Sequence, residues 1–309
     1  MKLISIVTPC YNEEENVEVV YREVKLIFES LKDYRYEHIF IDNASKDKTV
    51  QILKSIAKVD KNVKIIVNAR NFGHIRSPYH ALLQAKGDAV ISIVADLQDP
   101  PSMIVDFIRK WEEGCKIVVG VKKHSEESLI MFSIRKTYYR LINRLSEVEM
   151  IKDFTGFGLY DKRIIEILRE IKDPYPYFRG LIADIGFEAV KIVYTQPARE
   201  RGITKNNFYT LYDIAMLGFV NHSKVPLRMA SFIGFVMACL SLIVALGYLI
   251  YKFIYWYELT VGIAPLVIGL FFFASVQLFF IGIIGEYVGS IYTQVKDRPL
   301  VIEKERINF

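Results

Sequence analysis

The amino-acid sequence predicts an α/β fold with a mostly parallel sheet, followed by interfacial helices and two membrane-spanning helices. Short β-branched runs alternate with helical patterns over residues 3–121, which is typical of strands joined by crossover helices. Two long apolar stretches lie within residues 226–291. Polar side chains directly follow three of the predicted strands, and in parallel sheets ligands bind at the carboxyl ends of the strands.

Each element of the globular part is predicted from its own pattern. Strands are expected at residues 3–8, 38–42, 63–68, 89–94 and 116–121. Helices are expected between them at residues 12–32, 47–59, 78–85 and 101–113. Asn12 and Asp47 are expected to be the N-caps of the first two helices, because their side chains accept hydrogen bonds from exposed helix amides.

Two further helical segments, residues 126–147 and 206–225, carry apolar side chains in an amphipathic pattern. Such segments either lie at a membrane interface or pack on the sheet. For the second segment the interfacial interpretation is favoured, because an apolar stretch follows it directly.

The apolar stretches, residues 229–250 and 261–284, each have roughly the 20 residues needed to cross a bilayer. Lys224 and Arg228 precede the first stretch, Lys296 and Arg298 follow the second, and residues 255–260 between the stretches contain no Lys or Arg. The positive-inside rule then predicts a multi-pass protein of the inner (cytoplasmic) membrane with both termini in the cytoplasm. The alternative, a buried helical hairpin, would need further hydrophobic segments to surround it.

The composition argues against several other classes of protein. A formal net charge of +5 suits an anionic membrane surface and is too small to indicate nucleic-acid binding. Cys10, Cys115 and Cys239 are far apart, so neither a disulfide framework nor a zinc site is predicted. The N-terminal segment turns polar after about seven residues, so no signal peptide is expected.

Two polar motifs follow the first and second predicted strands. Residues 8–13 present an aromatic ring, an amide and a carboxylate, which are the groups that a nucleoside needs. Residues 42–47 add a carboxylate and an amide. The candidate nucleoside-binding residues are Tyr11, Asn12, Glu13, Asp42 and Asn43. The alternative is that these motifs only cap the helices that follow them.

The third motif, residues 95–101, follows the fourth predicted strand. Asp96, Gln98 and Asp99 offer oxygen ligands, which Mg²⁺ and Mn²⁺ prefer and often share with a substrate diphosphate. Asp99 stands before two prolines, so its alternative role is to begin the next helix.

Four segments resemble the family 2 glycosyltransferases, which have a GT-A fold, in order and spacing: TPCYNEEEN at 8–16, IDNASKDKT at 41–49, ARNFG at 69–73 and DLQDPP at 96–101. The two apolar stretches and GEYVGSIYTQVKDRPL at 285–300 resemble the polyprenyl-phosphate branch. That branch includes dolichol-phosphate mannose synthases and the bacterial GtrB-like enzymes.

The resemblance implies four regions: a cytoplasmic catalytic domain at 1–205, a juxtamembrane amphipathic helix at 206–228, a two-helix anchor at 229–291 and a cytoplasmic tail at 292–309. It implies transfer of a sugar from a nucleotide sugar to a polyprenyl (undecaprenyl or dolichyl) phosphate, with inversion. A UDP-linked donor is favoured over a GDP-linked one, and the sequence leaves that choice open. The implied partners are this donor, this acceptor and membrane lipids; whether the protein forms a homo-oligomer stays open.

The resemblance also implies roles for individual residues. The nucleotide would be held by Pro9, Tyr11, Asn12, Glu13, Asp42, Asn43, Arg70, Asp96 and Gln98. The metal, Mg²⁺ or Mn²⁺, would be held by Asp96 and Gln98. The catalytic group would comprise Asp96, Asp153, Arg199, Arg201 and Lys205, whose cations clamp phosphate groups.

Three positions depart from the family pattern. Val94 replaces a usual metal-binding acid, Asn43 replaces a usual aspartate, and Phe157 stands where an acid is common, which makes Asp153 the candidate. Two rival functions therefore stay open. One is transfer to a glycolipid or glycan hydroxyl, with Asp153 as general base. The other is a catalytically weakened protein that binds nucleotide sugars.

Overall fold

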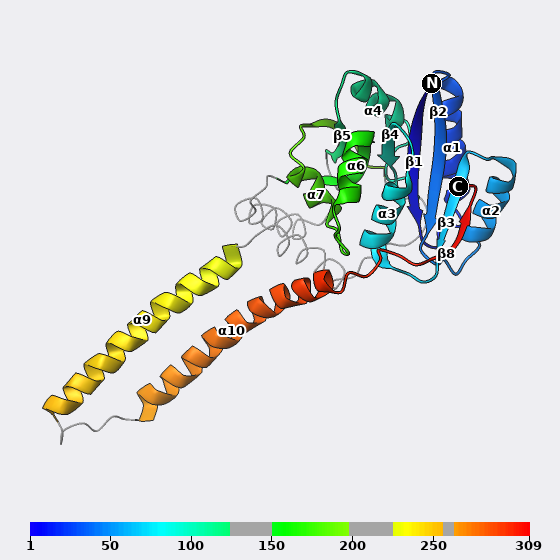
Figure 1. Cartoon of the computed structure of the whole chain (residues 1–309). Helices are drawn as coiled ribbons and strands as arrows, with labels where there is room; N and C mark the ends of the chain where they lie inside the picture. Colours follow the sequence, from blue (N-terminus) through cyan, green and yellow to red (C-terminus); the bar gives the residue numbers. More distant parts are fainter. Residues whose placement is uncertain (124–149, 198–224, 256–262) are drawn as a thin grey trace.

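The computed structural model describes residues 1–123, 150–197, 225–255 and 263–309. It contains an α/β domain from which two long helices extend as a pair (Figure 1). Several predicted features lie outside the described residues: the amphipathic segments 126–147 and 206–224, and the site residues Arg199, Arg201 and Lys205.

The domain is built on an eight-stranded sheet in the order β7-β5-β6-β4-β1-β2-β3-β8. The strands are β1 (Lys2–Cys10), β2 (Tyr34–Asp42), β3 (Val63–Asn68), β4 (Ala89–Ser92), β5 (Ile117–Lys122), β6 (Phe154–Asp161), β7 (Ala189–Tyr194) and β8 (Glu303–Ile307). β1 pairs in parallel with β2 and β4, and β2 pairs in parallel with β3. Only β6 and β8 run against their neighbours. The predicted mostly parallel α/β sheet is confirmed.

Helices cover both faces of this sheet. They are α1 (Val17–Ser30), α2 (Thr49–Val59), α3 (Gly73–Gln84), α4 (Met103–Glu112), α6 (Lys162–Glu170) and α7 (Phe178–Asp184). Alternate residues of each strand point to opposite faces. In β1, Val7 packs in the cluster with α3, α6 and α7, whereas Ile4 and Ile6 pack in the cluster with α1 and α4. A third cluster joins β2 and β3 to α2.

Two predicted helix starts are wrong. Asn12 has a left-handed backbone with φ of 53°, so it lies in a turn, and α1 begins at Val17 after Asn16 as N-cap. α3 begins at Gly73 and contains Pro78, which was expected to begin it. The predicted N-cap Asp47 is wrong by one residue, because Lys48 holds the N-cap position of α2. The Asp47 carboxylate nevertheless accepts from the Thr49 amide at 3.0 Å.

The C-terminal residues form an edge strand that no sequence pattern predicted. β8 pairs antiparallel with β3, and the Ala69 amide donates to the Ile302 carbonyl at 2.9 Å. Because four of its five residues are charged, β8 carries none of the apolar alternation that marks a strand. The segment after the last long helix therefore returns to the sheet.

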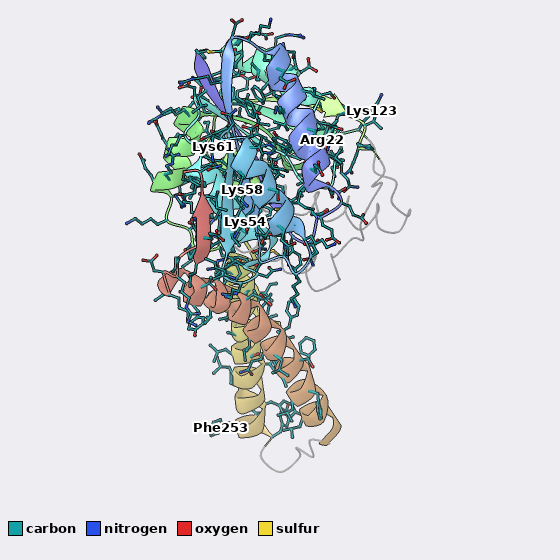
Figure 2. The ribbon with its side chains drawn as sticks, turned by 90° about the vertical axis from the view of Figure 1, so that its right-hand side faces the viewer. Arg22, Lys54, Lys58, Lys61, Lys123 and Phe253 are labelled. Carbon is teal, nitrogen blue, oxygen red and sulfur yellow. The ribbon has the colours of Figure 1, made fainter. Side chains whose placement is uncertain are left out.

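The two long helices are α9 (Val225–Ile254) and α10 (Ile263–Val295). Both contain stretches long and apolar enough to cross a membrane, Val225–Val244 and Gly269–Val295. Figure 2 shows Phe253 at the end of α9 farthest from the domain. The apolar side chains of both helices are largely exposed, as expected of helices that face lipid.

His38 gives the fold a testable dependence on pH. It is fully buried in β2, and its Nε2 lies 2.9 Å from the Thr8 hydroxyl. Burial lowers the pKa of His38 to about 3. The unfolded chain, with a histidine pKa of about 6.5, binds a proton first as pH falls, so stability is lost below about pH 6.5.

We expect His38→Gln to remove this loss. When the pH falls from 6.5 to 5, the unfolding free energy of the wild type should decrease by about 2 kcal/mol because of His38. The variant should not show this decrease. Thermal unfolding of the detergent-solubilised full chain at both pH values measures the difference. Equal Tm losses in the two proteins would contradict the prediction.

Candidate active site

A pocket of about 430 Å³ opens at one edge of the sheet. It is bordered by Pro9 at the end of β1, by the loop after β4, and by Lys122 at the end of β5. Thr155 and Gly156 also line it, because β6 runs antiparallel and begins at the edge where the parallel strands end. α3 closes the pocket with side chains from His74 to Leu82. This is where an α/β sheet binds its ligands.

The loop after β4 supplies the acidic side of the pocket. Leu97 has a φ of 60°, and this turn lets the Gln98 amide donate to the Asp96 carboxylate at 3.2 Å. Asp96, Gln98 and Asp99 all line the pocket. All three offer oxygen ligands, as a hard divalent cation requires. Among the described residues, no group of three or more His, Cys, Asp or Glu side chains is placed to hold a metal.

Asp99 is the most buried acid of the pocket, with 4% of its surface exposed. Its carboxylate accepts a hydrogen bond from the Tyr194 hydroxyl at 2.8 Å, which ties the β4 loop to β7. Burial raises the pKa of Asp99 to about 6, and the Asp96 charge adds to this, whereas Tyr194 and Lys122 oppose it. Asp99 is therefore part of the site as well as the residue that precedes α4.

Two pocket cations were not predicted. Lys122 ends β5, and Arg179 lies in the first turn of α7. Arg179 donates to the Phe154 carbonyl at 3.4 Å, and its guanidinium lies 5.3 Å from the centroid of the Tyr177 ring. Lys122 directly follows a predicted strand and could have been found by that signal. Arg179 follows no strand end, and only the tertiary structure brings it to the pocket.

Hydrogen bonds join the loops after β1 and β2 beside the pocket. The Asn12 amide donates to the Ser45 hydroxyl at 2.8 Å, and the Asn12 side-chain oxygen accepts from the Lys46 amide at 2.8 Å. The Glu13 amide donates to the Thr49 hydroxyl at 2.9 Å. The predicted motifs of these two loops are therefore neighbours, held in register by Asn12 and Glu13.

Asp42 lies at the end of β2 with no exposed surface. Its Oδ2 accepts from the Ser45 amide at 2.9 Å. Its Oδ1 is buried and accepts no hydrogen bond from the described residues. Burial raises the pKa of Asp42, although its bonds to Ser45 oppose this. A buried acceptor without a donor is costly unless a ligand supplies one.

Asn43 makes its hydrogen bonds within the protein. Its Nδ2 donates to Asn71 Oδ1 and to the Gly73 carbonyl, each at 3.0 Å. Its Oδ1 accepts from Asn68 Nδ2 at 3.1 Å and from the Phe72 amide at 2.8 Å. Asn43 thus holds the segment from β3 to α3 in place. Its predicted contact with a nucleotide stays a prediction.

Of the sequence-predicted residues in the described part of the chain, Pro9, Asp96 and Gln98 line the pocket. The others lie outside its lining: Tyr11, Asn12, Glu13, Asp42, Asn43, Arg70 and Asp153. Asp153 has a left-handed φ of 57° just before β6, and its carbonyl accepts from the Lys122 amide. Arg70 is exposed, with its guanidinium 4.1 Å from the Phe72 ring centroid.

Comparison with known proteins decides the family. Residues 5–168, which cover β1 to α6, match the glycosyl transferase family 2 domain. The chain belongs to glycosyltransferase family 2. It is 33% identical over 305 residues to the SfII prophage-derived bactoprenol glucosyl transferase of Shigella flexneri, covering 98% of this chain and 97% of that protein.

An uncharacterized glycosyltransferase, YkcC of Bacillus subtilis, is also 33% identical, over 305 residues that cover 96% of this chain and 92% of that protein. Among solved structures, glucosyl-3-phosphoglycerate synthase from Mycobacterium tuberculosis, crystallised with Mn²⁺, UDP and phosphoglyceric acid, superposes with a TM-score of 0.52. It is 18% identical and covers 71% of this chain and 76% of that chain. This likeness supports the GT-A fold, and the predicted family and fold are confirmed.

The site of this glycosyltransferase therefore has three parts. Asp96, Gln98 and Asp99 give the pocket an oxygen-rich side, Lys122 and Arg179 add positive charge, and the β1 and β2 loops lie beside them. Cations can hold phosphate oxygens while carboxylates hold a metal. Such a pocket can bind a substrate that carries several phosphate groups.

Asn43→Asp tests the role of the Asn43 amide. The substitution restores the charge that the family commonly has, yet it places a carboxylate against the acceptors Asn71 Oδ1 and Gly73 O. We expect a loss of about 3 kcal/mol of unfolding free energy, because two buried donors disappear. Thermal unfolding measures the loss, with the exposed Gln51→Glu on α2 as matched control. A Tm equal to that of the control would overturn the structural role of Asn43.

Proposed function

We propose that this glycosyltransferase transfers a sugar from a UDP-linked donor to a polyprenyl phosphate at the cytoplasmic membrane face, with inversion at the anomeric carbon. The observation that carries the proposal is a pocket with both acids and cations, in a chain that continues into two exposed apolar helices. The relatives named bactoprenol glucosyl transferase support the same acceptor class.

The donor nucleoside is assigned to the loops after β1 and β2. The unpartnered Asp42 Oδ1 supports this, because a nucleobase or ribose offers the donor that the carboxylate lacks. Tyr11 supplies an aromatic face, and Pro9 lies between these loops and the pocket. The diphosphate then points toward Asp96 and Lys122. Contacts of Asn12, Glu13 and Arg70 with the nucleotide remain part of the proposal.

A divalent metal, Mg²⁺ or Mn²⁺, fits Asp96 and Gln98. Both line the pocket with oxygen ligands, next to Asp99 in the same loop, and oxygen ligands suit a hard cation. When bound, the ion would neutralise charge on the donor diphosphate. Val94 leaves this set one carboxylate short of the usual family pattern.

The acceptor phosphate needs little activation, because its oxygen is already anionic near neutral pH. That oxygen attacks the anomeric carbon, a new carbon–oxygen bond forms, and the nucleoside diphosphate leaves with the electrons of the broken bond. Lys122 and Arg179 are placed to hold phosphate oxygens through this change of charge. Asp153, Arg199, Arg201 and Lys205 keep their predicted catalytic roles as part of the proposal.

The proposed membrane arrangement follows from the charges that flank the apolar stretches. Lys296 and Arg298 follow α10 and Arg228 lies in the first turn of α9, which favours cytoplasmic location of both chain ends. The catalytic domain at 1–205, the amphipathic helix at 206–228, the anchor at 229–291 and the tail at 292–309 are proposed as regions. In this scheme β8 lies in the tail region of the sequence, although it pairs with β3 and so forms part of the sheet of the catalytic domain.

The decisive experiment is a donor screen with the purified full chain and undecaprenyl phosphate, followed by mass spectrometry of the lipid product. An acid-labile sugar linked to lipid phosphate is expected with a UDP-sugar. A stable glycoside of a lipid or glycan hydroxyl would support the rival acceptor instead. Nucleotide binding without turnover by any donor would support the weakened-protein alternative.

Asp96→Ala tests the metal assignment. Loss of the carboxylate should lower kcat/KM on the order of 10²–10³-fold, because charge on the diphosphate is no longer neutralised. The matched control is Asp106→Ala on α4, whose carboxylate is exposed and pairs only with Arg109 in the described structure. If both variants keep wild-type activity, Asp96 does not hold the metal.

Val94→Asp tests whether the missing acid weakens the metal site. Val94 lines the pocket and is 36% exposed, so a carboxylate fits there without burial. We expect the Mn²⁺ concentration for half-maximal activity to fall roughly tenfold, since each added ligand charge tightens binding. Isothermal titration of Mn²⁺ in the presence of UDP gives a second measurement. Unchanged Mn²⁺ dependence in both would contradict this prediction.

A further inference from the structure

Three arginines gather where the last long helix rejoins the domain. Arg70 precedes α3, Arg76 lies in its first turn, and Arg298 follows α10 by three residues. The guanidinium carbons of Arg70 and Arg76 lie 4.1 and 5.4 Å from the centroid of the Phe72 ring. Arg76 Nη2 donates to the Pro299 carbonyl at 2.5 Å, which brings Arg298 beside it. Figure 1 shows the chain passing this end of α3 on its way to β8.

The charge of these arginines is not balanced within the described structure. Four other arginines in the described ranges form ion pairs with carboxylates: Arg22, Arg109, Arg163 and Arg306. No carboxylate of the described chain lies within ion-pair distance of the three clustered guanidinium groups. Arg76 Nε is in addition buried and donates to no described partner.

Arg76 is also affected by its neighbours. Burial lowers the pKa of Arg76 and the charge of Arg70 lowers it further, whereas Tyr175 opposes this more strongly than the charge of Arg298 adds to it. The nearby Asp173 carboxylate accepts hydrogen bonds from Gln294 and from the Tyr175 amide. A cluster of like charges with an unused donor is stabilised by an anion that enters it.

This cluster lies on a different side of α3 from the pocket. Arg76, His80 and Gln84 follow at four-residue steps and contact the C-terminal segment: Arg76 meets Pro299, His80 meets Glu303 at 2.6 Å, and Gln84 accepts from Arg306 at 3.0 Å. The pocket is lined instead by His74, Ile75, Pro78, Tyr79 and Leu82 of the same helix. Arg76 and Arg298 therefore do not line the pocket, and Arg70 alone of the three is also assigned to the donor nucleotide.

Its position points to a membrane lipid. The apolar stretch of α10 ends at Val295, and three residues of chain reach about 10 Å at most. Lys296 lies 4.1 Å from the Tyr292 ring centroid, which is the arrangement of basic and aromatic residues found at a membrane interface. Phosphate groups of lipids lie at this depth. Arginine matches phosphate with several donors in one plane.

We propose that Arg76 and Arg298, with Arg70 adding charge, bind the phosphate of an anionic phospholipid headgroup and hold the domain against the membrane surface. This proposed lipid site has a function other than sugar transfer. It is therefore tested by measuring lipid binding and not by measuring turnover. Failure of the transfer assay would therefore leave it untouched, and its own failure would leave the transfer proposal untouched.

The experiment uses the purified full chain in a neutral detergent with added phosphatidylglycerol or phosphatidylcholine. Bound lipid is counted by native mass spectrometry, and Tm is followed against lipid concentration. We expect phosphatidylglycerol to bind more tightly than phosphatidylcholine. Arg298→Gln and Arg76→Gln should each weaken it roughly fivefold, as expected for one cation at a lipid surface. Lys58→Gln, which removes an exposed charge from α2 (Figure 2), is the matched control.

Equal phosphatidylglycerol binding by the two arginine variants and the Lys58→Gln control would overturn the proposal. Arg298 donates no hydrogen bond within the described structure, so Arg298→Gln removes no internal contact of that kind. This variant therefore tests the lipid-binding proposal even if Arg76→Gln fails to fold. Glycerol phosphate and undecaprenyl phosphate are added as competitors. Displacement of phosphatidylglycerol by equimolar glycerol phosphate would show a free-phosphate site and contradict the lipid assignment, as would preferential binding of undecaprenyl phosphate.

Discussion

The side-chain amide of Asn43 makes four hydrogen bonds that hold the sheet edge on which the site is built. Its partners come from the end of β3 and the start of α3, and its backbone amide donates to the Cys10 carbonyl at the end of β1. These loops would otherwise leave buried polar groups without partners, which is costly. The position of α3, and with it one wall of the pocket, therefore depends on hydrogen bonds that Asn43 makes within the protein.

The charges of the pocket show why it suits a phosphate-rich substrate. Asp99 is buried against Tyr194, so its charged form is stabilised chiefly by Lys122 and that hydroxyl. Arg179 is anchored more weakly, by a carbonyl and an aromatic ring. A cation that is held in place without a carboxylate partner keeps its donors for a ligand. In the proposed function, the acids would hold the metal and the cations would hold phosphate oxygens.

Much of this arrangement follows from local patterns. The strand at Val63–Asn68 agrees with the predicted range, because a β-branched run between polar turns has few alternatives. Asp96 and Gln98 reach the pocket because parallel strands end at one edge. Where prediction failed, the cause was tertiary. The α3 start at Gly73 has no N-cap signal, since Asn43 supplies its fixing contacts from another strand.

One pocket cation, Arg179, and one strand, β8, were missed for the same reason. Arg179 comes to the site only because α7 packs on β6, where Tyr160 and Phe178 meet edge to face. β8 is charged along its length, so it becomes a strand only when β3 offers an unpaired edge. Neither long-range pairing leaves a periodic signal in its own segment. The roles of Arg199, Arg201 and Lys205 rest on resemblance alone.

The pairing of β8 with β3 also determines how the two long helices are connected to the site. A chain that left α10 as a loose tail would let the domain move freely above the bilayer. Here the segment after α10 is fixed by Arg76, by His80 and by an edge of the sheet. Figure 1 shows the two long helices leaving from the side of the domain where β1 ends. In the proposed function, a lipid-borne acceptor would therefore approach the pocket from the side on which the helices leave, where Asp96 and Gln98 line it.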